Sequence, residues 1–189
     1  QGNPSGQYYL GLLYNNGVII ERNFEKAAKW YQLSAEQGYS DAQYNLGVLF
    51  ENGEGVAQNF QEAFKWYALS AEQGDDWAQN ALGTMYDYGL GTPEDNSKAV
   101  KWFRLSAEQG NSAAQNNLGT MYHYGEGVSQ NFQKAAEWYR MSADQGDVSG
   151  QYNIGWMYDN GKGVDQNKDE AKKWYQLSAE QNYSDAQNN

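Results

Sequence analysis

The string Ser34-Ala35-Glu36-Gln37-Gly38 returns four times along the chain, always after a step of 36 residues. Two copies, Ser70–Gly74 and Ser106–Gly110, are identical to it, and the copies at Ser142–Gly146 and Ser178–Asn182 change one residue each. A fixed period of this size is the signature of a repeat solenoid. The sequence therefore predicts stacked copies of one small unit, which present a long surface to a partner.

Each copy contains two segments with the apolar spacing of a helix. In the second copy, the first segment places Leu46, Leu49 and Phe50 on one side, and a second apolar stripe follows between Asn59 and Gln73. The pattern predicts first helices near 4–15, 40–51, 76–87, 112–123 and 148–159, and second helices near 24–37, 60–73, 96–109, 132–145 and 168–181. Helix caps are predicted before the second helices at Asn23, Asn59, Asn131 and Asn167, and after them at Gly38, Gly74, Gly110, Gly146 and Asn182.

The clearest copy contains Leu118-Gly119-Thr120-Met121-Tyr122, then Gly125-Glu126-Gly127-Val128, then Trp138-Tyr139. This pattern resembles the Sel1-like repeat family, a relative of the tetratricopeptide repeat, and the resemblance covers essentially the whole chain. It implies an all-α fold, a right-handed α/α superhelical solenoid of antiparallel helix pairs, with a role in protein–protein interaction. The first copy departs from the pattern, because Gly17-Val18-Ile19-Ile20 lacks the second glycine of the turn.

We expect one solenoid domain over residues 1–189, with five repeats that start at residues 7, 43, 79, 115 and 151 and partial repeats over 1–6 and 187–189. Neither end has the atypical polar sequence of a capping repeat, which predicts a piece of a longer array. Apolar faces would then be uncovered, at Leu10 and Tyr14 near one end and at Trp174 and Tyr175 near the other. Such faces predict end-to-end self-association.

The composition excludes several classes of protein. A net charge of −11 argues against a nucleic-acid partner, because phosphate binding needs clustered Lys and Arg. No apolar run approaches the length of a membrane span. The chain has no cysteine, which leaves the compartment open between bacterial periplasm or envelope and cytoplasm.

No set of residues in the sequence points to catalysis. His123 is the only histidine, and no nucleophile with an orienting group is implied around it. The span Asp159–Glu170 has the length of a calcium-binding loop, but glycines and Val164 occupy its ligand and turn positions. Its Asp165, Asn167 and Asp169 form a slightly better oxygen cluster, which we interpret as a helix cap at Asn167 with acids in the first turn, where the helix dipole favours them. The sequence predicts no enzyme, no cofactor and no metal.

Tryptophan and glycine recur at fixed positions of the repeat. Five tryptophans at one position are predicted to be core residues: Trp30, Trp66, Trp102, Trp138 and Trp174. Trp77 and Trp156 lie outside this pattern and are candidates for contact with a partner. A glycine inside each first helix costs up to about 1 kcal/mol relative to alanine, which predicts a compensating close approach of a neighbouring helix. These glycines are Gly11, Gly47, Gly83, Gly119 and Gly155.

The predicted partner surface is the exposed side of the first helices, which line the concave face in tetratricopeptide relatives. The candidates are first-helix residues outside the apolar stripe: Tyr44, Asn45, Val48, Glu51, Thr84, Asp87, Tyr88, Asn117, Thr120, His123, Tyr124, Tyr152, Asn153, Trp156 and Asp159. Asn45, Asn117 and Asn153 form a ladder of amides that could bind the backbone of an extended segment.

Charge is distributed unevenly between the two kinds of helix. All 13 Lys and Arg lie outside the first helices, which carry Asp41, Glu51, Asp76, Asp87 and Asp159 with no compensating base. The surface therefore predicts a basic or neutral protein or peptide as partner, unless the acids only keep the chain soluble. Two alternatives to an interaction scaffold remain open: a structural spacer or assembly element of a larger protein, and a carbohydrate or cell-wall binding module.

Overall fold

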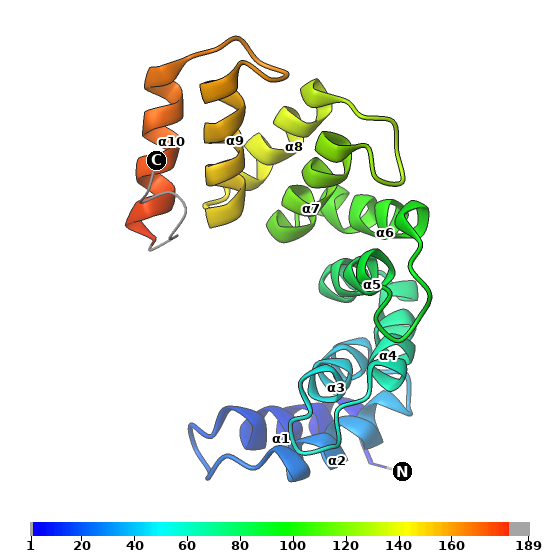
Figure 1. The fold of residues 1–189 in the computed structure, drawn as a ribbon. Coiled ribbons are helices and arrows are strands. Elements are labelled where there is room, and N and C mark those ends of the chain that lie inside the picture. Colours follow the sequence, from blue (N-terminus) through cyan, green and yellow to red (C-terminus); the bar gives the residue numbers. More distant parts are fainter. Residues whose placement is uncertain (1, 182–189) are drawn as a thin grey trace. The chain divides into compact units, whose positions relative to one another are not determined.

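The computed structural model describes residues 2–181, which form ten α-helices and no strand (Figure 1). The first helices are α1 (Pro4–Asn16), α3 (Ser40–Asn52), α5 (Asp76–Tyr88), α7 (Ser112–Tyr124) and α9 (Val148–Asn160). The second helices are α2 (Phe24–Ala35), α4 (Phe60–Glu72), α6 (Asn96–Glu108), α8 (Phe132–Asp144) and α10 (Lys168–Glu180). All ten predicted helices are confirmed, with ends within two residues of the expected ones. The predicted cap at Asn182 and partial repeat at 187–189 lie outside the described residues.

The helices gather into two compact units, Gln1–Asp95 (unit 1, with α1–α5) and Asn96–Asn189 (unit 2, with α6–α10). Within unit 1 each helix packs against the next one in the chain. Unit 2 repeats this order, and α7 also contacts α9 directly, so that these two first helices are neighbours. Each unit is thus a stretch of all-α helical solenoid, as predicted. The expectation of a single domain stays a prediction.

The recurring Ser-Ala-Glu-Gln-Gly string holds the two helices of a copy together. Ser34, which is fully buried, donates a hydrogen bond through Oγ to the carbonyl oxygen of Pro4 at 2.7 Å. Gln37 donates through Nε2 to Oε1 of Gln7 at 2.6 Å. The same pair of contacts recurs at the last copy, from Ser178 and Gln181. The string recurs because its serine and glutamine satisfy buried polar groups that would otherwise be costly.

The predicted helix caps are present. The side-chain oxygens of Asn23, Asn59, Asn131 and Asn167 accept backbone N–H groups of the second helices that follow. The glycines that follow these helices have φ between +85° and +98°. Replacing such a cap residue by alanine typically destabilises a protein by about 1 kcal/mol. Because cap residues are favoured at helix ends, they allowed the ends to be located from the sequence.

The glycine inside each first helix is buried, as predicted. A Cβ atom added at Gly47 would lie 2.7 Å from ring atoms of Tyr67, and one at Gly119 would lie 2.7 Å from Cδ1 of Tyr139. The absent side chain is therefore the space in which a tyrosine of the paired second helix lies. Tyr67 is 1% exposed and Tyr139 is 3% exposed.

The tryptophan prediction is only partly right. Trp66 and Trp174 are buried, but Trp30, Trp102 and Trp138 are half-buried. The next residue along the helix forms the core in the first four copies, since Tyr31, Tyr67, Phe103 and Tyr139 are all buried. The apolar stripe includes both positions, and the copies differ in which of them is buried, since Trp66 and Tyr67 are both buried and Trp174 is more buried than Tyr175.

The prediction of an uncovered apolar face at Trp174 is wrong. Trp174 was expected to be uncovered, but it is only 5% exposed, and the Arg140 guanidinium lies 4.9 Å from its ring centroid. Tyr175 and Tyr14 are half-buried. Leu10, at 39% exposed, is the one residue of the four that presents a clearly exposed apolar side chain.

Candidate functional site

Five of the predicted partner residues meet around one cavity in unit 2. His123, Tyr124, Tyr152, Asn153 and Trp156 line it together with Tyr139, and its volume is about 240 Å³. The first five come from α7 and α9, which are neighbours, and Tyr139 comes from α8, which packs against both. We refer to this space as the His123 cavity.

Aromatic rings surround His123 on several sides. Its ring centroid lies 5.1 Å from that of Trp156, 4.7 Å from Tyr124 and 5.4 Å from Phe132. Burial lowers the pKa of His123, and the positive charge of Lys162 lowers it further. The imidazole is therefore neutral at neutral pH, and the cavity offers aromatic faces and uncharged hydrogen-bonding groups.

The predicted amide ladder links first helices to one another. Asn153 donates from Nδ2 to Oδ1 of Asn116 at 2.8 Å, which connects α9 to α7. Asn45 occupies the same repeat position in unit 1, near Tyr8 of α1, where it opposes the rise of the Tyr8 pKa that burial causes. The Asn153–Asn116 bond thus joins two first helices of neighbouring copies, and only the remaining hydrogen-bonding capacity of Asn153 faces a partner.

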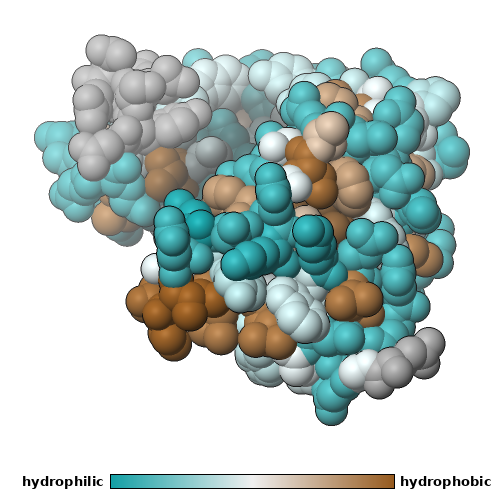
Figure 2. Space-filling model, turned by 90° about the horizontal axis from the view of Figure 1, so that it is seen from below, coloured by the Kyte–Doolittle hydropathy of each residue, from teal (hydrophilic) through white to brown (hydrophobic). Residues whose placement is uncertain are grey.

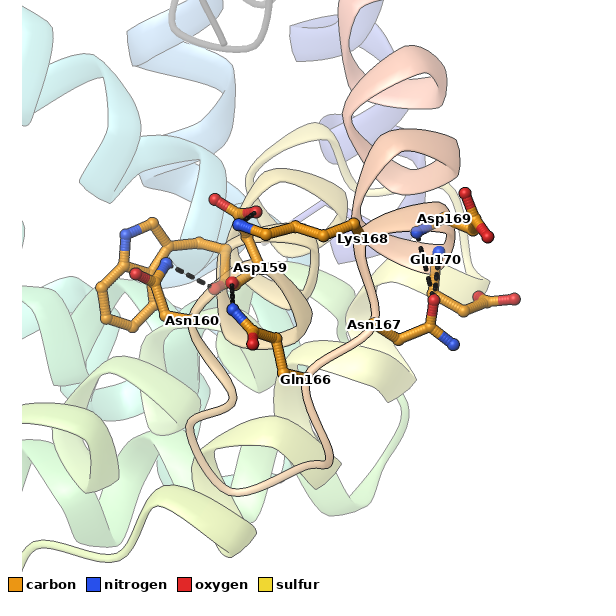
Figure 3. A network of polar contacts seen from close by, with 8 residues as sticks. Asp159, Asn160, Gln166, Asn167, Lys168, Asp169 and Glu170 are labelled. Atoms are coloured by element: carbon orange, nitrogen blue, oxygen red, sulfur yellow. Dashed lines mark hydrogen bonds and ion pairs between the residues drawn. The ribbon is translucent and has the colours of Figure 1, made fainter.

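The expectation that first-helix acids have no compensating base is wrong for Asp159. The ammonium group of Lys168 lies 2.5 Å from Oδ1 of Asp159 (Figure 3). The turn after α9 brings the first residue of α10 back over the end of α9, so an acid near the end of one helix meets a base at the start of the next. In the same turn, the Asn167 oxygen accepts the N–H groups of Asp169 and Glu170.

Glu51 is also engaged within the fold. The Tyr67 hydroxyl donates to Oε2 of Glu51 at 2.5 Å. Asp87, at the same repeat position, is half-buried. These acids are therefore not uniformly available to a partner.

Carboxylates gather around Tyr44 in unit 1. The pKa of Tyr44 is raised first by burial and then by the negative charges of Asp75, Glu51 and Asp76. Burial also raises the pKa of Asp75, against a lowering hydrogen bond from the Ala78 N–H, and Asp76 and Asp41 raise it further. Unit 1 as a whole has 13 acidic and four basic residues, whereas unit 2 has 11 acidic and nine basic residues. The excess negative charge therefore lies mainly in unit 1.

The remaining predicted residues differ in exposure. Tyr88 and Tyr124 are 70% and 64% exposed at the ends of α5 and α7. Thr84 and Thr120 donate to carbonyl oxygens one turn earlier in their own helices. Val48 and Asn117 are half-buried. Trp77, the other tryptophan outside the repeat position, is 57% exposed and free to contact a partner.

Sequence reasoning missed two features of unit 2. Tyr139 is a buried core residue of α8, and it also lines the His123 cavity. A second cavity of about 380 Å³ is lined by α8, α9 and the turn after α9, with Glu137 and Arg140 of α8 and Tyr158 of α9 in its lining. No signal in the sequence distinguished Glu137 and Arg140 from an ordinary solvated helix face.

The described residues hold neither a metal-binding cluster nor a membrane-spanning helix. Residues 2–181 hold no group of three or more His, Cys, Asp and Glu side chains that could bind a metal ion. None of the helices in this part of the chain is long and apolar enough to cross a membrane.

Comparisons with known proteins agree with this architecture. The Sel1 repeat model matches residues 4–39, 40–75, 78–111, 112–147 and 148–183. A search of curated proteins found no match. A Sel1 repeat protein from Oxalobacter formigenes is 36% identical, with a TM-score of 0.93 over 97% of this chain and 73% of that one.

Two more solved structures extend the comparison. The protein c5321, described as a protective antigen of uropathogenic Escherichia coli with an SLR fold, is 41% identical with a TM-score of 0.90. That match covers 97% of this chain but 39% of c5321. The immunity protein Pa5087 from Pseudomonas aeruginosa shares the fold at 21% identity and a TM-score of 0.63, over 98% of this chain and 69% of that one. From its repeats and its similarity to these structures, the chain belongs to the Sel1 repeat family.

Proposed function

We propose that this chain is a non-enzymatic scaffold that binds a basic or neutral segment of another protein on the exposed side of its first helices. The observation that carries the proposal is the His123 cavity, because five of its six lining residues come from first helices that hold no Lys or Arg. Sel1 repeat proteins generally mediate protein–protein interaction and are typically non-catalytic scaffolds.

The two units are suited to different parts of a partner. The carboxylates around Tyr44 in unit 1 favour Lys or Arg side chains, since opposite charges accelerate encounter and discriminate against acidic partners. The His123 cavity favours an uncharged side chain, because Lys162 lies close enough to lower the pKa of His123 and would repel a cation. A cavity of about 240 Å³ accommodates one apolar or aromatic side chain.

Synthetic peptides of one length test the proposal. A Lys/Leu peptide, a Ser/Leu peptide and a Glu/Leu peptide are titrated into the full chain by calorimetry at low and physiological salt. We expect the Lys/Leu peptide to bind best and to lose affinity as salt rises, and the Glu/Leu peptide not to bind. Equal binding of all three would contradict the proposed preference for basic or neutral segments, and binding of none would favour the spacer alternative.

Variants then locate the binding surface. Trp156→Ala removes a wall of the His123 cavity and should weaken binding of the Ser/Leu peptide about tenfold, the usual scale for an anchoring aromatic. Lys101→Ala and Lys173→Ala, on exposed faces of second helices, are the matched controls and should leave binding unchanged. If Arg140→Ala abolishes binding while Trp156→Ala does not, the partner binds the second helices and the proposal is wrong.

A further inference from the structure

Four of the five turns within the helix pairs carry a second glycine that touches the preceding copy. These glycines, with φ between +65° and +70°, are Gly55, Gly91, Gly127 and Gly163. Each lies against the backbone of the first residue of the preceding second helix: Phe24, Phe60, Asn96 and Phe132 respectively. A Cβ atom at any of the four would come closer than 3.0 Å to that backbone carbonyl group. The contact is a shared feature of how one copy stacks on the one before it.

The first turn has isoleucine at this place. Ile19 lies 36 residues before Gly55, in the sequence Gly17-Val18-Ile19-Ile20. Two obstacles keep Ile19 from the position that Gly55 holds. A β-branched residue rarely adopts a positive φ, and its Cβ would collide with main-chain atoms, which cannot swing away as a flexible side chain can. The first turn, which contains Ile19, therefore cannot adopt the packing that the other four turns share.

We propose that Ile19 ends the repeat stack: the α1–α2 face cannot accept another Sel1 repeat in the packing that joins the copies of this chain. The block applies to any repeat that approaches this face in the packing that joins the copies of this chain. Stacking the α1–α2 pair of one molecule on the α9–α10 pair of another would be a head-to-tail contact, which grows into open filaments unless it closes into a ring. Ile19 prevents that mode of growth. The predicted end-to-end self-association is thereby limited to arrangements other than in-register stacking.

The surroundings of Ile19 show why such a block matters. Val18 and Ile19 are 86% and 77% exposed, and the same end of α1 presents a largely apolar cavity that includes Leu12 and Leu13. Apolar side chains gather at one edge of the molecule in the space-filling view (Figure 2). An exposed apolar face favours association. Ile19 is part of this face, and as a steric obstacle it restricts which association is possible.

Transfer of the isoleucine to an interior turn is the first test. In Gly55→Ile, the turn after α3 should no longer stack on the start of α2. We expect the melting temperature to fall by more than about 5 °C and amide hydrogen exchange in α1 and α2 to accelerate at least about tenfold. The matched control is Glu54→Ile, which adds the same side chain at the position of Val18 and should change the melting temperature by less than about 2 °C. Unchanged melting and exchange in Gly55→Ile would overturn the proposal.

Addition of a repeat is the second test and does not depend on a destabilised variant. Residues 40–75 replace residues 1–3 in front of Pro4, once with Ile19 and once with Ile19→Gly. With glycine, the added repeat should stack, raise the melting temperature and protect its amides from exchange. With isoleucine, the added repeat should exchange freely and give no increase. Ile19→Gly in the parent chain controls for the substitution itself. Equal gains with isoleucine and glycine would overturn the proposal.

Discussion

Units 1 and 2 are built from the same repeat but present different surfaces. Unit 1 has a net charge of −9, from 13 acidic and four basic residues, and unit 2 has a net charge of −2, from 11 acidic and nine basic residues. At one repeat position near the end of the first helix, unit 1 has Glu51 and Asp87, whereas unit 2 has His123 and Asp159. The buried positions hardly differ between the units. The repeat thus specifies a scaffold, and a few first-helix positions specify what each unit can bind.

The largest expected effect is shared by both units. Gly47→Leu and Gly119→Leu each force a side chain into the ring of Tyr67 or Tyr139, and each should cost about 3 kcal/mol of unfolding free energy through overpacking. Urea denaturation measures the loss. Gly6→Leu, where an added Cβ meets only Asn3 at 4.0 Å, is the control and should be nearly neutral. A large loss in one unit only would show that the two scaffolds are not equivalent.

The second expected difference between the units is the stability lost when a buried tyrosine hydroxyl is removed. Tyr67→Phe in unit 1 removes a hydrogen bond to the Glu51 carboxylate and should cost about 2 kcal/mol. Tyr139→Phe in unit 2 removes a 3.2 Å contact with Thr120, between uncharged groups, and should cost about 1 kcal/mol. Tyr31→Phe should be neutral or stabilising, because the buried Tyr31 hydroxyl has no hydrogen-bond partner. The reverse ranking in denaturation experiments would contradict this account.

Acid should weaken unit 2 through His123. Burial lowers the pKa of His123 in the folded state, so the unfolded chain binds a proton more readily. The stabilising contribution is complete above the unfolded pKa of about 6.5 and is lost as pH falls through 6.5 toward the lowered folded pKa. His123→Gln should remove this part of the pH dependence between about pH 7 and pH 5, as followed by thermal melts. An unchanged profile in His123→Gln would assign the effect to other groups.

The smallest expected effect lies in unit 1. Burial and neighbouring carboxylates raise the pKa of Asp75, so its ionised form is destabilised in the fold. Asp75→Asn keeps the side-chain oxygen that caps α5 and removes the charge, and should stabilise the chain by a few tenths, on the order of 0.5 kcal/mol, at pH 7. Asp147→Asn in unit 2 changes the equivalent cap of α9 and is the control. If Asp75→Asn destabilises the chain and Asp147→Asn does not, the charge of Asp75 has a favourable partner.

Much of the candidate surface followed from the repeat, because a fixed period transfers one helix face to every copy. The period placed His123, Tyr152 and Trp156 on the same side of neighbouring first helices, and in unit 2 they line one cavity. It could not include Tyr139, because a residue on a core stripe and a residue at the rim of a cavity have the same spacing. It also could not show that Asn153 is hydrogen-bonded to Asn116, since that contact joins residues on different helices.

The sequence by itself determined the secondary structure, the caps and the pairing of helices within a copy. These features depend on local chemistry, such as the Asn23 cap, and on spacing that repeats without insertion, such as Gly11 opposite Tyr31.

Only the tertiary structure decided which side chains are available to a partner. Lys168 reaches Asp159, Tyr67 reaches Glu51, and Trp174 is buried beneath Arg140, because each contact depends on the distance between two helices. Ile19 illustrates both what the sequence determines and what tertiary packing decides. The missing glycine is visible in the sequence, but its consequence depends on the backbone that Gly55 touches in the preceding copy. Local propensities are encoded residue by residue, whereas steric exclusion and charge pairing arise only when helices pack.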